Sequence, residues 1–423
     1  MGLGSWFSTP NEIVMASLKT VGVAAEIMKP MRILVIHNRY REFGGEDAVV
    51  DGEIELLRGA GHDVQTLLWS NDDIRTDGPL RKAAALANAT WSRSAWQAVR
   101  RTVRDSKPDV VHVHNTVAAA SPAVVHAAAV PGVGIVHTLH NYRHLCLNGL
   151  LFRNERLCTD CVGRLPWRGV TRACYRGSRS ESMALAFGEV VHRALGSWSH
   201  VHRFIVFSEH AKRLHVEAGF DAQRIALKPQ TLATDPGVGQ HRGAFALFAG
   251  RLAVGKGVGV LLHAWKESRL DLPLVIAGDG PEAERVRRDV VAIPGAKMLG
   301  QITRPQLMPL MHDACLLVVP SLWFEGFPVT LLEGLATGCP VVASDVGALR
   351  EIIRSGENGV LVQPGDSRAL GKVIRGLIES PGERERLARG ARASYQERFS
   401  PERSRQTLER IYQEAIAAAR DAT

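Results

Sequence analysis

A short stretch of the chain, PSLWFEGFPVTLLEGLATGCPVV at residues 320–342, combines residue types that can bind phosphate and sugar. Pro328 suits the first position of a helix, because the N–H that proline lacks would have no partner there. Gly338 favours the end of the same helix. The free amides of Val329 and Thr330 would present N–H groups and the positive end of a helix dipole to phosphate oxygens. The stretch therefore predicts an anion site at a helix N-terminus.

The same stretch carries two glutamates, Glu325 just before the turn and Glu333 further along the helix. Two carboxylates beside an anion site would be poor phosphate ligands. They are strong hydrogen-bond acceptors, however, and sugar hydroxyls are donors that suit such acceptors. The pair therefore predicts that the bound molecule carries a sugar as well as phosphate.

Two cations come earlier in the chain, in FAGRLAVGKG at residues 248–257. Arg251 follows an apolar run, and Lys256 lies between two glycines. The Gly-Lys-Ser/Thr arrangement of a Walker loop is missing, but the two charges could stabilise a diphosphate leaving group. The chain contains no Asp-X-Asp sequence, so a divalent metal holding that diphosphate is not indicated.

Alternating apolar runs and helical patterns must position these residues. From Met31 onward the order of short strand, helix and strand is typical of parallel βαβ units. The expected elements are strands at 32–37, 63–69, 110–114, 134–139 and 204–207, a helix at 46–58, further strands at 244–250, 272–278, 314–320 and 339–345, and a final amphipathic helix from Ser400. The fold class is therefore α/β, with two Rossmann-like, doubly wound parallel sheets that face a central cleft.

A Pro-, Gly- and Thr-rich stretch, KPQTLATDPGVGQHR at residues 228–242, interrupts this pattern and indicates an interdomain linker. The chain is accordingly divided into an N-terminal extension at 1–30, an N-terminal domain at 31–228 with a Cys-rich insertion at 144–180, a linker at 229–242, a C-terminal domain at 243–398 and a returning helix at 399–423.

Composition narrows the class of protein. The chain of 423 residues has 45% hydrophobic and 22% charged residues, as ordinary soluble domains do. A net charge of +9 favours anionic partners, which include nucleic acid, acidic lipids and phosphorylated small molecules. Residues 110–142 lack charged side chains, but histidines and prolines interrupt them, so no membrane span is expected. With no clear signal peptide, the cytoplasm is the default compartment.

In their order and spacing, these motifs resemble the retaining glycosyltransferases of family 4, which have the GT-B fold. The resemblance covers roughly residues 31–420. It rests on Gly-Arg-Leu followed by Lys-Gly, then AGDGP at 277–281, Pro-Ser, and two glutamates separated by seven residues. It also includes GG-ED at 44–47, PDVVHVHN at 108–115 and LHN at 139–141.

The resemblance implies a role for each matching residue. Glu325 would bind hydroxyls of the donor sugar, and Glu333 would bind those of the nucleotide ribose. The implied catalytic set is Glu325, His140, Arg251 and Lys256; the implied donor-binding set is Glu333, Val329, Thr330, Gly326, Phe327, Gly44 and Gly45. The C-terminal domain would hold a UDP- or GDP-sugar, and the N-terminal domain would hold a glycan or lipid-linked acceptor. No cofactor would be required for catalysis.

Two departures from the family pattern stand out. The position before Lys256, often acidic in the family, is Gly255, and the Asn-Gly-X-Asp that often follows the hinge is absent from KPQTLATD. The second departure leaves the contacts between the hinge and the donor open.

Four of the six cysteines fall inside the Cys-rich insertion: Cys146, Cys158, Cys161 and Cys174. Clustered thiols in a reducing compartment favour a structural zinc site. Unliganded thiols, and redox chemistry or disulfides, stay open as alternatives. Cys315 and Cys339 begin predicted buried strands and fit small core residues.

Other functions are kept beside the transferase. His112 and His114 alternate on one strand and could suggest a metal pair, although hydrogen-bonded structural histidines are favoured. A sucrose-synthesising GT-B enzyme is one rival, and a basic zinc-knuckle protein that binds nucleic acid is another. The transferase hypothesis predicts no nucleic-acid partner. It leaves open a peripheral contact with an anionic membrane at the inner face of the cytoplasmic membrane.

Overall fold

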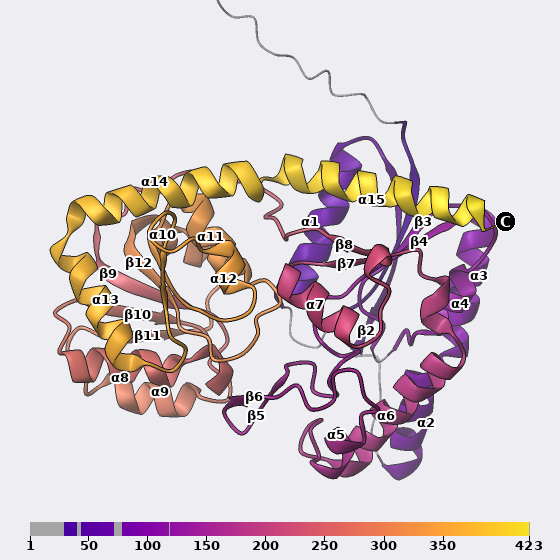
Figure 1. Cartoon of the computed structure of the whole chain (residues 1–423), viewed down its shortest axis with the longest axis horizontal. Helices are drawn as coiled ribbons and strands as arrows, with labels where there is room; N and C mark the ends of the chain where they lie inside the picture. Colours follow the sequence, from indigo (N-terminus) through magenta and orange to yellow (C-terminus); the bar gives the residue numbers. More distant parts are fainter. Residues whose placement is uncertain (1–28, 40–43, 72–77, 118, 423) are drawn as a thin grey trace, which may run out of the picture. The chain divides into compact units, whose positions relative to one another are not determined.

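Buried, branched apolar residues form two separate parallel sheets, one in each half of the chain. The computed structural model describes residues 29–39, 44–71, 78–117 and 119–422 (Figure 1). Residues 31–423 form one compact unit. Nearly all of the extension predicted at residues 1–30 lies outside the described residues.

The first sheet has the strand order β2-β1-β3-β4-β7-β8, and every pair is parallel. The strands are β1 (Arg32–Arg39), β2 (Asp63–Ser70), β3 (Val110–Val113), β4 (Gly134–Thr138), β7 (Arg203–Val206) and β8 (Ile225–Leu227). The order reverses between β1 and β3. Ligands of such sheets bind beyond the carboxyl ends of the strands at this switch point.

The second sheet has the order β11-β10-β9-β12-β13-β14, again parallel throughout. Its strands are β9 (Gly243–Ala249), β10 (Leu274–Ala277), β11 (Lys297–Gly300), β12 (Ala314–Val319), β13 (Val341–Ser344) and β14 (Val360–Val362). Its switch point lies between β9 and β12. The loops that follow these two strands carry the residues from Arg251 to Lys256 and from Pro320 to Glu325.

Helices cover the faces of both sheets. Those of the first half are α1 (Gly45–Gly59), α2 (Pro79–Thr90), α3 (Arg93–Ser106), α4 (Ala123–Ala128), α5 (Trp167–Thr171), α6 (Arg179–Ala194) and α7 (Glu209–Glu217). Those of the second half are α8 (Val258–Ser268), α9 (Ala283–Val290), α10 (Arg304–Asp313), α11 (Val329–Thr337), α12 (Leu349–Ile352), α13 (Ser367–Glu379), α14 (Pro381–Arg398) and α15 (Pro401–Asp421).

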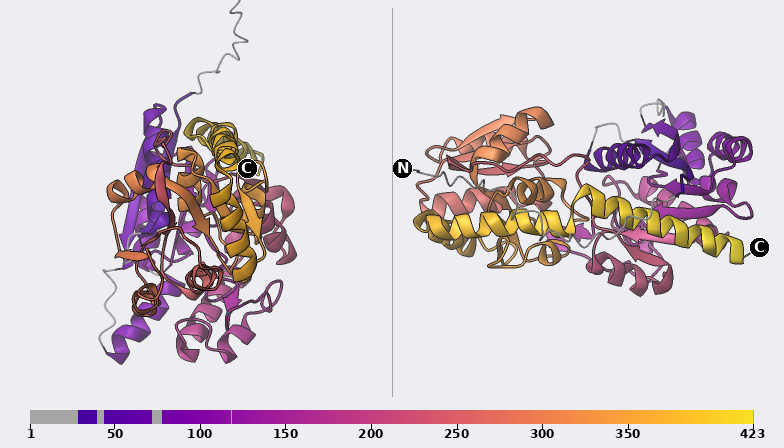
Figure 2. Two further views of the ribbon diagram at one scale, coloured as in Figure 1. Left: turned by 90° about the vertical axis from the view of Figure 1, so that its left-hand side faces the viewer. Right: turned by 90° about the horizontal axis from the view of Figure 1, so that it is seen from above.

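The predicted terminal helix is confirmed as α15, and it packs on the first sheet, not the second (Figure 2). A Cβ added to Gly134 of β4 would lie 2.9 Å from the backbone nitrogen of Ile416, so the helix and the strand are in direct contact. The Tyr412 hydroxyl lies 2.7 Å from Nδ1 of His112, and Glu409 lies 3.1 Å from the His62 ring. The C-terminus is thereby tied to the N-terminal sheet.

Two local expectations need correction. Pro328 is the N-cap of α11, not its first residue, and the helix begins at Val329 because Pro328 has an extended backbone, with ψ 121°. The Cys-rich insertion contains more regular structure than its glycines and arginines indicate. It holds a small antiparallel hairpin, β5 (Phe152–Arg153) and β6 (Arg156–Leu157), and the short helix α5.

Candidate active site

Glu325 and Lys256, which follow β12 and β9, meet each other directly. Lys256 Nζ donates to both carboxylate oxygens of Glu325, at 2.9 and 3.0 Å, and the Ser321 hydroxyl donates to the same carboxylate at 2.6 Å. Burial alone would raise the pKa of Glu325, but Lys256 and Ser321 outweigh it, so the pKa lies below its ordinary value. The site therefore holds an ionised, buried carboxylate against a partly exposed ammonium group.

The missing acidic residue before Lys256 has a physical explanation in Trp323. A Cβ added to Gly255 would lie 2.0 Å from the Trp323 ring, so any side chain at this position would displace the indole. Lys256 Nζ lies 5.8 Å from the centre of the same ring, within the range of a cation–π contact. Trp323 thus occupies the space beside the lysine.

Replacing Gly255 with alanine should lower kcat/KM about tenfold, because the displaced indole would no longer hold Lys256 in place. Steady-state kinetics would measure this effect. Gly376→Ala is the control, because a Cβ there meets nothing within 4 Å. The double variant Gly255→Ala/Trp323→Ala removes the clash but also the indole, so it should be no more active than Gly255→Ala. Wild-type activity in Gly255→Ala would contradict the role given to Trp323.

Glu333, on α11, is paired with Arg304 at the start of α10, at 3.0 Å. The glutamate side chain is only 4% exposed, whereas the arginine is 48% exposed. Burial raises the pKa of Glu333 above its ordinary value even though Arg304 opposes the shift. Glu333 is therefore a desolvated acceptor with one solvated partner.

Replacing Glu333 with glutamine should raise Tm at pH 7 by about 1–3 °C while raising the KM for the donor about tenfold. A raised folded-state pKa means that the ionised form destabilises the fold above that pKa, and that this cost disappears as the pH falls through it. The gain in Tm should therefore vanish near pH 4. Thermal melts at both pH values test this, and a lower Tm at pH 7 would show that the Arg304 pair outweighs burial.

The N-terminus of α11 faces residues of the other half of the chain. A Cβ at Gly45, the first residue of α1, would lie 3.5 Å from the Val329 side chain. A Cβ at Gly326 would lie 2.9 Å from the carbonyl oxygen of His140. The predicted Gly45, Gly326, Val329 and His140 are therefore brought together.

The remaining predicted donor-site residues are placed around this point. Gly44 is the N-cap of α1, and its amide donates to Asp47 at 3.0 Å. Thr330 follows Val329 in the first turn of α11. Phe327 is buried, and its ring packs against the rings of Phe207 and Phe399. Arg251 follows β9 and is exposed, with no ion pair to any residue in the described ranges.

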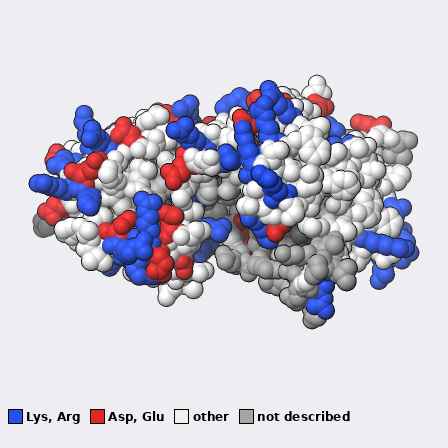
Figure 3. Space-filling model, turned by 90° about the horizontal axis from the view of Figure 1, so that it is seen from below, with Lys and Arg blue, Asp and Glu red and all other residues white. Residues whose placement is uncertain are grey.

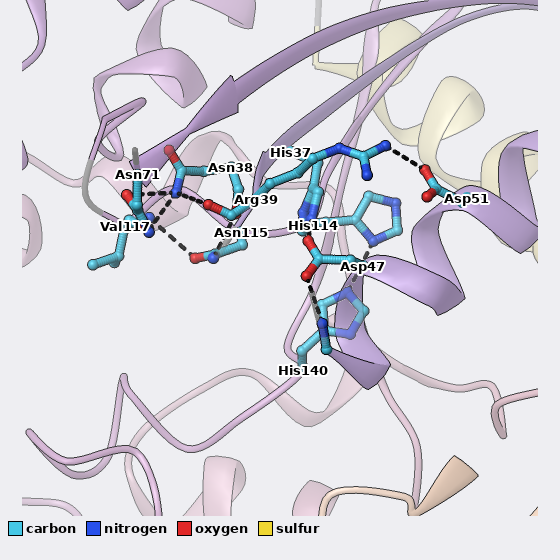
Figure 4. Close-up of polar contacts among 11 residues, drawn as sticks. His37, Asn38, Arg39, Asp47, Asp51, Asn71, His114, Asn115, Val117 and His140 are labelled. Carbon is cyan, nitrogen blue, oxygen red and sulfur yellow. Dashed lines mark hydrogen bonds and ion pairs between the residues drawn. The ribbon is translucent and has the colours of Figure 1, made fainter. Parts of the chain in front are cut away.

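His140 is part of a chain of polar groups that runs from Lys228 through Glu53 and His114, and Figure 4 shows its contact with His114. Its Nε2 lies 2.9 Å from Nδ1 of His114, and Nε2 of His114 lies 3.8 Å from the Glu53 carboxylate. Glu53 also accepts from Lys228 at 2.5 Å. Burial holds the pKa of both histidines well below the ordinary value, so both rings are neutral.

The Glu53 carboxylate determines which ring nitrogens carry protons. One proton must lie between the two rings. If it were on His114, the bare Nε2 of that ring would face the negative carboxylate. We therefore expect His114 to carry its proton on Nε2, and His140 to donate from Nε2 to His114. Nδ1 of His140 is buried without a partner among the described residues, and it is left as a hydrogen-bond acceptor.

A second polar network joins the end of β1 to residues that follow β2 and β3 (Figure 4). The Asn38 amide donates to Asn71 at 2.9 Å and to the Val117 carbonyl at 2.7 Å, and Asn115 donates to the Asn38 carbonyl at 2.9 Å. Burial opposes ionisation of Asp47, but hydrogen bonds from the His37 ring and the Gly44 amide lower the pKa of Asp47 below its ordinary value. These contacts hold the Gly44–Gly45 turn in place.

Glu53, His112 and His114 come close enough to suggest a metal site, since one ligand atom of each lies within 4.8 Å of the others. Both ring nitrogens of His112 are already hydrogen-bonded, to Tyr412 and to Thr138, each at 2.7 Å. Lys228 contacts one oxygen of the Glu53 carboxylate, and the other oxygen lies 3.8 Å from Nε2 of His114. His112 is therefore a hydrogen-bonded structural group, whereas His114 connects the carboxylate to His140.

A pocket opens beside His140 at the carboxyl ends of β3 and β4. Among its lining residues are the apolar side chains of Leu86, Leu147 and Leu185 from the surrounding segments. Glu189 of α6 also lines the pocket. Its carboxylate pairs with Arg193 at 3.0 Å and lies 3.6 Å from the His144 ring. The pocket thus joins an apolar wall to hydrogen-bonding groups at one end.

Sequence reasoning missed Ser321, Arg304, Trp323, Glu53 and Lys228. Ser321 was within the Pro-Ser motif, and Trp323 lay two residues before Glu325, so their proximity was a usable signal. The other three lie far along the chain from the groups they contact, and no local pattern marks them. The four insertion cysteines line one small pocket, which is separate from the donor-site residues.

Comparison with known proteins agrees with this geometry. The chain matches the family model described as Glycosyltransferase Family 4 over residues 43–230, and the one described as Glycosyl transferases group 1 over residues 237–394. The glycogen synthase of Mycobacterium tuberculosis is 27% identical over 404 residues, covering 86% of this chain and 89% of the relative. The phosphatidyl-myo-inositol mannosyltransferase of Mycobacterium leprae is 27% identical over 370 residues, covering 83% and 88%.

A solved structure shows the same architecture. Anabaena HepE in complex with UDP superposes with a TM-score of 0.63 at 17% sequence identity, covering 90% of this chain and 100% of HepE. Both halves of the chain match glycosyltransferase models, and both sheets have the order expected of Rossmann-like domains. The chain therefore belongs to glycosyltransferase family 4 and has the GT-B fold.

Proposed function

We propose that this glycosyltransferase moves a sugar, with retention of configuration, from a UDP- or GDP-sugar to a glycan or lipid-linked acceptor in cell-surface polysaccharide synthesis. The observation that carries the proposal is the pairing of Lys256 with the buried Glu325 beside the N-terminus of α11. A helix N-terminus and a cation, which can bind a diphosphate, lie there beside a carboxylate, which can bind a sugar. HepE, which shares the fold, was solved with UDP.

The residues would act by positioning and charge. Lys256, Arg251 and the amides at the start of α11 would stabilise the negative charge that develops on the departing diphosphate. Glu325, released from Lys256 as the lysine turns to phosphate, would accept hydrogen bonds from the sugar. The acceptor hydroxyl would attack the reacting carbon of the sugar from the face that the diphosphate leaves, and the departing phosphate would take the acceptor proton, so that retention needs no nucleophile from the enzyme.

The pocket beside His140 is the proposed acceptor site. Its apolar wall suits the hydrocarbon part of a lipid-linked acceptor, and Nδ1 of His140 can accept a hydrogen bond from a hydroxyl. Exposed apolar side chains on α2 and α6, among them Leu86, Met183 and Phe187, extend from the pocket to the surface. On the face in Figure 3, the N-terminal half shows broad uncharged areas flanked by Lys and Arg.

These features support a peripheral contact with an anionic membrane at its cytoplasmic side. None of the helices in the described residues is long and apolar enough to cross a bilayer.

A screen of UDP-, GDP- and ADP-sugars by thermal shift tests the donor, and NMR of the product's anomeric proton tests retention. Glu325→Gln should bind the preferred donor about tenfold more weakly and free nucleoside diphosphate as the wild type does, because only the sugar contact is lost. If Glu325→Gln bound every donor as tightly as the wild type does, the role of Glu325 would be refuted. A product of inverted configuration would refute the mechanism.

The rival functions give different results in the same assays. A sucrose-synthesising enzyme would use fructose or its phosphate as the acceptor. A nucleic-acid-binding protein would show salt-sensitive affinity for RNA or DNA and no stabilisation by any nucleotide sugar.

A further inference from the structure

The four cysteines of the insertion converge on one small pocket although 28 positions separate the first, Cys146, from the last, Cys174. All four are half-buried free thiols, and none lies in a helix or a strand. The shared lining of this pocket brings the four thiols into one region of the insertion. Nothing in the proposed transfer reaction uses these sulfurs.

The surroundings of the pocket suit a negatively charged centre. Three arginines line it, Arg153, Arg168 and Arg172, and the last of these also pairs with Asp160. Four thiolates around one divalent cation carry a net charge of −2, which nearby arginines would offset. Neutral thiols would not need this arrangement.

We propose that Cys146, Cys158, Cys161 and Cys174 bind one structural Zn²⁺ ion. Four thiolates in two loop segments and a Cys-X-X-Cys turn are typical ligands of a closed tetrahedral zinc site. A pair of disulfides would add no negative charge to balance Arg153 and Arg168, whereas Arg172 already pairs with Asp160.

Binding requires the sulfurs to move closer together. In zinc sites the sulfurs stand ~3.8 Å apart, given a Zn–S distance of ~2.3 Å. Among the described residues, Glu53, His112 and His114 have ligand atoms that all lie within 4.8 Å of one another. The four cysteines do not form such a group. Because all four cysteines lie outside helices and strands, the proposal requires their side chains or loops to rearrange when the ion binds.

The site would hold the insertion against the donor-binding half. Cys158 directly follows the β5–β6 hairpin, and its amide donates to the Leu151 carbonyl at 2.8 Å. Phe152 in that hairpin packs edge-on against Trp323, with ring centres 6.0 Å apart. Trp323 in turn lies against Lys256. The zinc ion would therefore stabilise the wall next to the Lys256–Glu325 pair, a consequence that rests on the proposed function.

Metal analysis of the full chain tests the site independently of activity. Protein purified under reducing conditions without chelator should contain about one zinc per chain. After exchange with Co²⁺ it should show the visible absorption bands of a tetrahedral thiolate site. Cys158→Ser/Cys161→Ser should lose both signals, whereas Cys315→Ser/Cys339→Ser, which changes two thiols of the C-terminal half, should keep them.

Wild-type protein with essentially no zinc, and no cobalt–thiolate bands, would overturn the proposal even if the double variants fail to fold. Zinc retained by Cys158→Ser/Cys161→Ser would overturn it as well, because the metal would then be elsewhere. A third variant, Phe152→Ala, should keep the zinc and lower kcat/KM at least about tenfold. Full activity in that variant would refute the link to Trp323 while leaving the metal site intact.

Discussion

Replacing Lys256 with alanine should lower kcat about 10²–10³-fold, which is the usual cost of removing one group that stabilises transition-state charge. The effect has two sources. The diphosphate loses a cation, and Glu325, only 8% exposed, loses the partner that keeps it ionised. The variant should therefore be impaired both in leaving-group departure and in sugar binding.

The pH dependence separates these two sources. In the wild type the pKa of Glu325 lies below its ordinary value, so activity should persist as the pH falls and be lost only when this carboxylate is protonated. Without Lys256, burial becomes the dominant influence and raises the pKa. The acidic limb of the kcat/KM profile should therefore move to higher pH in Lys256→Ala.

Lys266→Ala is a suitable control, because Lys266 is exposed on α8, the helix that follows the same loop. It should retain wild-type kcat and the wild-type pH profile. An unchanged acidic limb in Lys256→Ala, with kcat reduced, would mean that Lys256 acts on the diphosphate alone and does not control Glu325.

The fold could be predicted from the sequence because the central strands of both sheets are buried on two faces. Runs such as RILVIH and ACLLVV contain almost only apolar residues, and helical patterns separate them, so the order of the elements leaves few topologies open. The hairpin β5–β6 was not expected, since strands of two residues leave no periodic signal.

The site could be predicted only in part, because motifs mark some of its residues and only tertiary contacts mark the others. Glu325, Glu333 and Lys256 stand in motifs whose spacing marks them. Arg304 and Glu53 look like ordinary helix charges in the sequence, and only the tertiary fold buries their partners. The departure at Gly255 had no explanation until Trp323 was found in the space that a side chain would fill.

Lys228 is a further residue whose burial could not be predicted from the sequence. In the sequence it begins a polar stretch that indicates a linker, where a lysine would be solvated. In the structure its side chain is only 1% exposed and its ammonium group contacts Glu53. A buried charge of this kind can exist only with its partner, which lies in a helix of the N-terminal domain.

Replacing Glu53 with glutamine should therefore lower the free energy of unfolding by about 3–5 kcal/mol, because Lys228 would be left buried without a counter-charge. The same substitution should change the site chemistry. With no carboxylate opposite Nε2 of His114, the proton between His114 and His140 is free to move to His114. Nδ1 of His140 would then carry a proton and could no longer accept a hydrogen bond.

Two measurements distinguish these effects. Denaturant unfolding reports the stability, and ¹⁵N NMR of labelled histidines reports which ring nitrogens are protonated. Glu55→Gln is the matched control, because Glu55 lies on the same helix and is exposed. It should leave stability, tautomers and kcat unchanged.

The double variant Glu53→Gln/Lys228→Met separates fold from function most sharply. Removing both charges should restore much of the stability that Glu53→Gln loses, since no unpaired ion remains buried. It should not restore kcat, because the carboxylate that orients the His114–His140 pair is still missing. If kcat returned together with stability, Glu53 would act only through folding. If kcat stayed low while the histidine tautomers matched the wild type, the proposed coupling from Glu53 through His114 to His140 would be wrong.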